Sequence, residues 1–131
     1  MKKRLISIER ENILYNQVVE KMEREKFYLQ HDCSINALAA ALHTDPRYIR
    51  SMVKDRMNVT FTAYLHQLRI GEAKLLLGRK RFLDTNIEAI AEKVGFQNRQ
   101  SFYNAFTQIE GVTPRQWKLE NNKHLLHNDK N

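Results

Sequence analysis

The fold is decided by residues 86–117, which run NIEAIAEKVGFQNRQSFYNAFTQIEGVTPRQW. Asn86 and Asn98 each precede an apolar pattern with helical spacing, as is typical of residues that cap helix N-termini. Gly95 and Gly111 follow these patterns, where glycine favours a turn or the end of a helix. The stretch therefore predicts two capped helices joined by a tight turn, which is the arrangement of a helix-turn-helix, and then a third helix.

An upstream segment repeats this pattern. Residues 34–42 match residues 86–94 at an offset of 52, and residues 45–53 match residues 98–106 at an offset of 53. Both copies begin with a capping side chain, carry alanine where the helices would cross and place apolar residues inward. The sequence therefore predicts two helix-turn-helix units. An ordinary helical bundle with chance matches is the alternative.

The whole chain of 131 residues predicts an all-α fold, because it lacks the alternating β-branched runs and the Asn-Gly turns of hairpins. Two helix-turn-helix subdomains are expected, joined by a long linker helix. The expected segments are residues 1–33 for the lead and first helix, 34–59 for the first helix-turn-helix, 60–78 for the linker helix, 79–123 for the second helix-turn-helix with a closing helix, and 124–131 for a polar, frayed tail.

Three local expectations follow from the same patterns. The first helix is expected from about residue 9 to residue 26. Gly78 is expected to end the linker helix in the left-handed conformation that glycine favours. The buried face of the first helix is expected to comprise Ile13, Leu14, Val18, Val19 and Met22.

Charge and composition restrict the function. The chain has a net charge of +7, and residues 44–120 carry thirteen Lys and Arg against eight Asp and Glu. A basic folded surface favours a polyanionic partner. The single cysteine excludes an intrachain disulfide and a cysteine-based zinc site. No apolar run approaches the ~20 residues that span a bilayer, so a soluble cytoplasmic protein is expected.

The motifs resemble those of a known family. Ile87-x-x-Ile90-Ala91-x-x-Val94-Gly95-Phe96 is followed by Ser101-Phe102-x-x-x-Phe106 and by Gly111-Val112-Thr113-Pro114-x-x-Trp117. Together with Leu38-Ala39 and Phe61-x-x-Tyr64-Leu65 in the first half, this string resembles the DNA-binding domain of the AraC/XylS family of bacterial transcription regulators over residues 12–120. The chain departs from the family pattern at Val53, Asn58, Thr107 and Trp117.

The resemblance implies sequence-specific binding of double-stranded promoter or operator DNA, with one recognition helix in each of two adjacent major grooves. RNA polymerase is an implied partner. An N-terminal sensor or dimerisation domain is expected to be missing, and a fragment of a larger regulator is favoured over a stripped-down family member. The expected location is the cytoplasm, at the nucleoid when the protein is bound to DNA.

Candidate DNA contacts follow from the outward positions of the two recognition helices, since their N-terminal parts face base edges in this motif. Arginine suits guanine, and glutamine or asparagine suits adenine. The candidate base contacts are Arg47, Arg50, Ser51, Arg99, Gln100, Tyr103 and Asn104. The candidate phosphate contacts are Lys54, Arg56, Arg79, Lys80, Arg81, Arg115 and Lys118.

The sequence leaves two other functions open. A protein-interaction module would dock RNA polymerase or a sensor domain and bind DNA only weakly. An enzyme would use Cys33 as a methyl acceptor, as in repair alkyltransferases that carry a similar domain, but their cysteine-rich metal site has no counterpart here. The five histidines also lack metal-ligand spacing. The sequence therefore predicts no enzyme, no cofactor and no metal.

Overall fold

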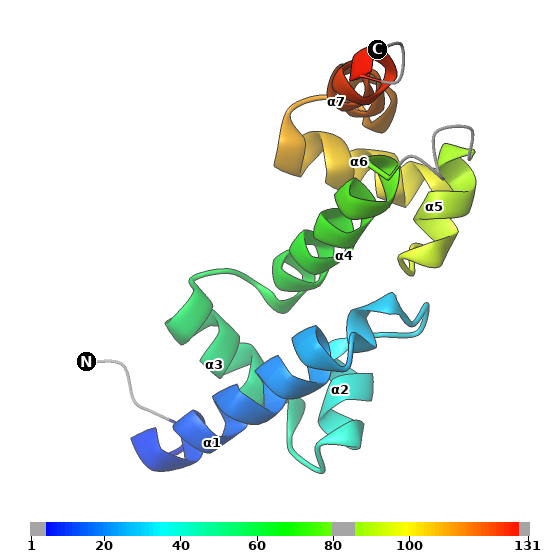
Figure 1. Cartoon of the computed structure of the whole chain (residues 1–131). Coiled ribbons are helices and arrows are strands. Elements are labelled where there is room, and N and C mark those ends of the chain that lie inside the picture. Colours follow the sequence, from blue (N-terminus) through cyan, green and yellow to red (C-terminus); the bar gives the residue numbers. More distant parts are fainter. Residues whose placement is uncertain (1–4, 80–85, 129–131) are drawn as a thin grey trace. The chain divides into compact units, whose positions relative to one another are not determined.

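The computed structural model describes residues 5–79 and 86–128, with side chains as far as residue 123 (Figure 1). Within these ranges every regular element is helical, which confirms the all-α expectation. The elements are α1 (Ile8–Val19), a π-helical turn (Glu20–Arg24), a 3₁₀ turn (Phe27–Leu29), α2 (Ile35–Ala41), α3 (Pro46–Met57), α4 (Phe61–Leu77), α5 (Ile87–Lys93), α6 (Arg99–Glu110) and α7 (Pro114–Asn128).

The chain divides into two compact units, unit 1 from Met1 to His66 and unit 2 from Gln67 to Asn131. Helix α4 begins in unit 1 and ends in unit 2. Each unit contains one of the two predicted helix pairs, α2 with α3 in unit 1 and α5 with α6 in unit 2.

In unit 1, both α1 and α2 pack against α3 (Figure 1). The helices begin where the sequence places capping side chains: Ser34 Oγ accepts the backbone N–H of Ala37 at 3.0 Å, and Thr60 Oγ1 accepts that of Ala63 at 3.1 Å. Burial of one apolar stripe per helix holds the unit together. The buried residues include Leu14, Val18, Met22, Leu38, Ala39, Ile49, Met52 and Val53.

In unit 2, α6 contacts both α5 and α7. Aromatic rings form the core of this unit. Phe102 is centred 5.4 Å from Phe96 and 5.7 Å from Phe106, and Phe106 lies 6.3 Å from Trp117. Phe102 and Phe106 are fully buried, as predicted. Edge-to-face packing of this kind fixes how α6 sits on its neighbours.

The two turns between paired helices have the same backbone geometry. His43 and Gly95, which correspond at the offset of 52, both adopt a positive φ, 54° and 102°. His43 donates its N–H to the carbonyl of Ala40, and Gly95 donates to that of Glu92. The internal repeat in the sequence is therefore matched by turns of the same kind in the structure.

The ends of α3 and α6 also correspond, at the offset of 53. Asn58 has a φ of 58° and donates to the carbonyl of Lys54, whereas Gly111 has a φ of 78° and donates to that of Thr107. Asparagine is one of the residues that tolerate this conformation, so Asn58 replaces glycine without loss of the turn.

Three local expectations differ from the structure. The first helix, expected from about residue 9 to residue 26, is α-helical only to Val19 and continues as the π-helical turn Glu20–Arg24. Ile13 is 60% exposed and Val19 is only half-buried, because the buried stripe follows Leu14, Val18 and Met22 at intervals of four residues and these two side chains lie beside it. Gly78 does not have a positive φ. Its N–H continues the helical pattern to the carbonyl of Lys74, and an added Cβ would lie 3.3 Å from that oxygen.

Helix α7 extends to Asn128, beyond the predicted end at residue 123. Within the predicted part of α7, the buried Asn122 donates its Nδ2 to the carbonyl of Leu77 at 3.2 Å and so binds α7 to the end of α4 within unit 2. This contact joins residues 45 positions apart and has no local sequence signal.

Candidate nucleic-acid interface

Helix α3 carries the first group of candidate base contacts on the side opposite its core. Its buried residues are Ile49, Met52 and Val53. Arg47 and Arg50 are exposed, and Ser51 is half-buried. Because residues three and four positions apart share a helix face, the structure brings these three candidates together on the first two turns of α3.

Arg47 is held by Asp45 at the start of α3. The Asp45 carboxylate accepts the backbone N–H of Arg47 at 2.8 Å and its Nη2 at 2.8 Å, while Arg47 Nε lies 3.2 Å from both carboxylate oxygens. The side-chain hydrogen bonds from Arg47 lower the pKa of Asp45, and they raise the pKa of Arg47 in turn. Both groups are therefore charged at neutral pH.

Helix α6 presents the second group. Gln100 and Asn104 are exposed and Tyr103 is half-buried, on the side opposite Phe102 and Phe106. Gln100 Nε2 donates to Asn104 Oδ1 at 2.8 Å. This bond uses the amide nitrogen of Gln100 and the carbonyl oxygen of Asn104. The carbonyl oxygen of Gln100 can then accept from adenine N6, and the amide nitrogen of Asn104 can donate to adenine N7.

Arg99 lies beside this group and is fixed between α5 and α6. Its Nη1 donates to Glu88 Oε1 at 3.1 Å, its Nη2 donates to Tyr103 Oη at 3.4 Å, and its guanidinium lies 4.8 Å from the centre of the Tyr103 ring. The hydrogen bond with Tyr103 and the nearby Glu88 charge raise the pKa of Arg99. Arg99 is therefore a fixed cation at the edge of the α6 face.

The side chains that hold these arginines, Asp45 and Glu88, are not among the candidate site residues predicted from the sequence. An acidic cap two residues before an arginine is a local signal that could indicate the pair of Asp45 with Arg47. Glu88 carried no such signal, because it lies on a different helix from Arg99.

The candidate phosphate contacts are spread over several elements. Lys80 and Arg81 lie outside the described residues, and Lys118 is half-buried. The exposed candidates lie at the ends of α3 and α4 and at the start of α7, and are Lys54, Arg56, Arg79 and Arg115.

Arg56 differs from the other candidates because it is engaged within unit 1. Its Nε donates to Glu11 Oε1 at 2.8 Å, its Nη2 donates to Asn12 Oδ1, and its guanidinium lies 5.4 Å from the Tyr15 ring centre. Glu11 is only 5% exposed, so this ion pair fastens the end of α3 to α1. A phosphate contact by Arg56 stays a prediction, and it would compete with this pair.

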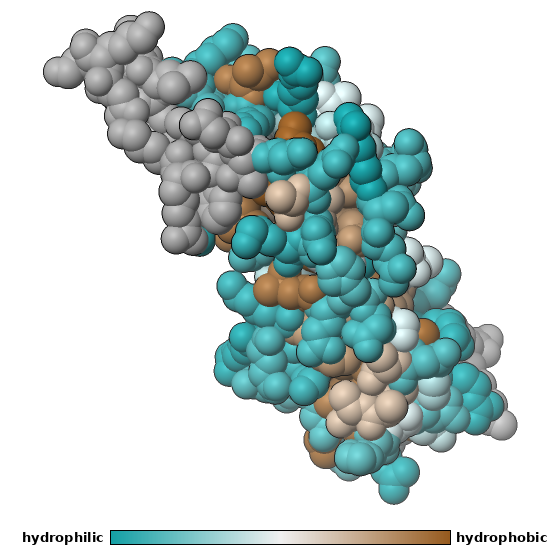
Figure 2. Space-filling model, turned by 90° about the vertical axis from the view of Figure 1, so that its right-hand side faces the viewer, coloured by the Kyte–Doolittle hydropathy of each residue, from teal (hydrophilic) through white to brown (hydrophobic). Residues whose placement is uncertain are grey.

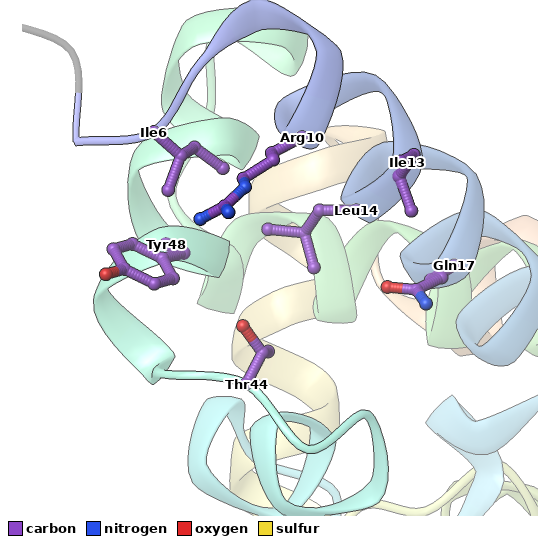
Figure 3. A pocket seen from close by; sticks show the side chains of 7 residues that line it. All are labelled: Ile6, Arg10, Ile13, Leu14, Gln17, Thr44 and Tyr48. Carbon is purple, nitrogen blue, oxygen red and sulfur yellow. The ribbon is translucent and has the colours of Figure 1, made fainter.

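A small open pocket of about 230 Å³ lies in unit 1 between the start of α1 and the start of α3 (Figure 3). Its walls mix apolar and polar side chains and hold no cysteine, histidine or carboxylate, so they give no support to a hydrolytic or metal-dependent activity there. The lining residues are Ile6, Arg10, Ile13, Leu14, Gln17, Thr44 and Tyr48.

Other chemical features of the described residues give little support to catalysis. No group of three or more His, Cys, Asp or Glu side chains is placed to hold a metal ion in this part of the chain. Cys33 is buried, with its Sγ 4.0 Å from Met22 Sδ.

The face of the molecule in Figure 2 is mainly hydrophilic, with hydrophobic residues scattered among the polar ones. Among the described residues, no helix is both long enough and apolar enough to pass through a lipid bilayer.

A family model described as "Helix-turn-helix domain" matches residues 38–120, which contain the second half of α2 and all of α3, α5 and α6. Among curated proteins, the chain is 37% identical over 94 residues to "HTH-type transcriptional activator RhaR" from Cronobacter sakazakii, a match that covers 72% of this chain and 30% of that protein. The chain spans less than a third of the length of the first curated relatives it matches.

Comparison with solved structures also finds domains of transcription and response regulators. The chain is similar to the C-terminal domain of AraT, a response regulator from Geobacillus stearothermophilus, with a TM-score of 0.65, 28% identity, and coverage of 90% of this chain and 88% of that one. An AraC-type transcriptional regulator from Chromobacterium violaceum has a TM-score of 0.70 at 17% identity, covers 84% of this chain and 96% of its own, and supports the fold alone.

Proposed function

The chain belongs to the AraC-type helix-turn-helix family of DNA-binding transcription regulators, and we propose that α3 and α6 are its two recognition helices. Each would place its N-terminal turns against base edges, with the two helices in adjacent major grooves. The chain thereby binds double-stranded promoter or operator DNA sequence-specifically.

One observation carries this proposal. The second helix of each pair presents a polar face at equivalent positions, and its opposite face is buried. In α3 these positions hold the exposed Arg47 and Arg50, and in α6 they hold the exposed Gln100 and the half-buried Tyr103. The two units share their turns and helix ends but differ in these side chains. Shared scaffolds with different exposed faces are expected when the two helices contact different bases.

The chemistry of each face suggests its target. Arg47 and Arg50 have the paired N–H donors that match guanine O6 and N7, and Gln100 and Asn104 have the amide groups that match adenine N6 and N7. Ser51, Tyr103 and Arg99 complete the proposed set. These contacts would supply specificity.

The exposed lysines and arginines would supply affinity. The chain has a net charge of +7, and each cation that neutralises a phosphate releases counterions and makes binding salt-dependent. Among the described residues the exposed candidates are Lys54, Arg56, Arg79 and Arg115, of which Arg56 also pairs with Glu11. Lys80 and Arg81 remain in the proposal from the sequence alone.

Further features of the proposal rest on the family and on its named relatives. The protein would act by binding, without catalysis or a cofactor, in the cytoplasm where it can reach DNA. RNA polymerase is a proposed partner, because the similar RhaR protein is named a transcriptional activator. A sensor or dimerisation domain is a second proposed partner, since the matched relatives are much longer than this chain.

Selection of bound molecules from random-sequence duplex DNA tests the proposal. The chain is expected to enrich a consensus with two groups of fixed bases. Binding without enrichment, or no binding at all, would contradict specific recognition and would favour a module that docks other proteins.

A further inference from the structure

Asp45 makes more hydrogen bonds with Arg47 than capping of α3 requires. Accepting the backbone N–H of Arg47 at 2.8 Å is enough to cap the helix. The same carboxylate also accepts Nη2 of the Arg47 side chain at 2.8 Å and lies 3.2 Å from its Nε. The pair therefore fixes the direction of the guanidinium as well as the start of the helix.

The geometry of the pair leaves a defined part of Arg47 open. A guanidinium is planar and carries five N–H donors in a rigid fork. Asp45 covers the edge formed by Nε and one hydrogen of Nη2. The edge formed by Nη1 and the other hydrogen of Nη2 remains, and two parallel donors of this kind match O6 and N7 of guanine. The Arg47 side chain is 68% exposed, so this edge is accessible.

The second unit provides an internal comparison. Asn98 corresponds to Asp45 and caps α6, with its Oδ1 accepting the N–H of Ser101 at 2.8 Å. Gln100 corresponds to Arg47 and is held by Asn104 instead. A neutral amide therefore suffices as a cap in this fold. The carboxylate occurs in the unit where the corresponding outward residue is an arginine.

We propose that Asp45 is a specificity-determining residue, which positions Arg47 so that its free edge contacts one guanine in the major groove. The proposal rests on the proposed function, in which Arg47 contacts bases. Without Asp45 the arginine can follow a phosphate or another base, and the discrimination at that base pair falls. The carboxylate also repels DNA phosphates, so its removal strengthens binding to unrelated DNA.

The experiment uses the whole chain and the duplex obtained by selection. Dissociation constants are measured for that duplex, for versions with each guanine replaced by adenine, and for an unrelated duplex. Asp45→Asn is the main variant, because Asn98 shows that asparagine caps such a helix. Asp45→Ser is a second variant with another good cap, and circular dichroism checks that both are folded.

Wild-type protein is expected to prefer guanine at one position by about tenfold or more. Asp45→Asn and Asp45→Ser are expected to lose most of that preference and to bind the unrelated duplex at least as tightly as wild type. In an Arg47→Ala background, Asp45→Asn should have no further effect on the preference. Asn98→Asp, the matched change in unit 2, should leave the preference at this position unchanged.

Two results would overturn the proposal, and they differ in what they imply. If Arg47→Ala removes the preference but Asp45→Asn and Asp45→Ser retain it, Arg47 contacts the base without help from Asp45. If Arg47→Ala leaves every base preference intact, the base contact of Arg47 itself is wrong, and the inference fails together with that part of the proposed function.

Discussion

Two cations on the same helix, Lys54 and Arg56, show how burial separates structural from DNA-binding charge. Both lie in the last turn of α3. Lys54 is exposed and has no ion pair among the described residues, whereas Arg56 pairs with Glu11, a buried carboxylate on α1. An ion pair between two exposed side chains contributes little to the free energy of unfolding. Removing the partner of a buried charge lowers that free energy much more, because the buried charge is left unpaired.

We therefore expect opposite effects from two substitutions. Arg56→Ala should lower the free energy of unfolding by about 2 kcal/mol, because a charged hydrogen bond to a buried carboxylate is lost. Lys54→Ala should leave stability nearly unchanged but reduce the slope of log K against log salt by about 1. Chemical denaturation and DNA titrations over a salt series measure both. Equal stability of the two variants would contradict the structural role of Arg56.

The caps show what could be predicted at the residue scale. Ser34, Thr60, Asp45 and Asn98 cap the predicted helices, because a cap depends only on residues within one turn. The pair of Arg56 with Glu11 could not be predicted, since it joins residues 45 positions apart. The candidate base contacts were placed together on their helix faces, but which of them touches DNA stays a prediction.

At the scale of elements, the helices were predicted better than their ends. The bounds of α2, α3, α5 and α6 agree closely with the caps and glycines in the sequence. Gly78 follows α4 as expected, but it does not adopt the left-handed conformation. Its N–H continues the helical hydrogen bonds to the carbonyl oxygen of Lys74, and an added side chain would crowd that oxygen. Sequence spacing predicts that a glycine lies at the end of the helix, but it does not show whether backbone conformation or a crowded neighbour requires that glycine.

Two glycines, one inside a helix and one directly after a helix, test whether a left-handed backbone requires glycine. An added Cβ would meet no atom within 4 Å at either Gly71, inside α4, or Gly111, after α6, but only Gly111 has a positive φ, of 78°. Gly71→Ala should stabilise the protein by up to about 1 kcal/mol through better helix propensity. Gly111→Ala should destabilise it by about 1–2 kcal/mol because of the left-handed backbone.

Thermal or urea unfolding of both variants measures this difference, with wild type as the reference. The prediction concerns sign as well as size. Stabilisation by Gly111→Ala would mean that the end of α6 does not require a left-handed residue, and the correspondence between Asn58 and Gly111 would lose its physical basis.

At the scale of the whole molecule, each unit has its own buried core. Phe102 is fully buried among the aromatic rings of unit 2, while Met52 is fully buried in unit 1. Removal of such a side chain leaves a cavity that costs about 3–5 kcal/mol for phenylalanine. The loss should fall first on the unit that contains the cavity.

Phe102→Ala should therefore reduce the hydrogen-exchange protection of α5 and α6 while α1 and α3 keep most of theirs. Met52→Ala should produce the reverse pattern, and serves as the matched control. Uniform loss of protection in both variants would show that the chain unfolds as one cooperative body, contrary to the division at residues 66 and 67.

The central claim is that α3 and α6 contact separate groups of base pairs. Parallel selections from random-sequence duplex DNA with wild type, Arg50→Ala and Gln100→Ala test it most directly. Wild type should enrich two groups of fixed bases, and each variant should lose preference in one group, a different one for each variant. Identical consensus sequences from all three proteins would contradict the claim.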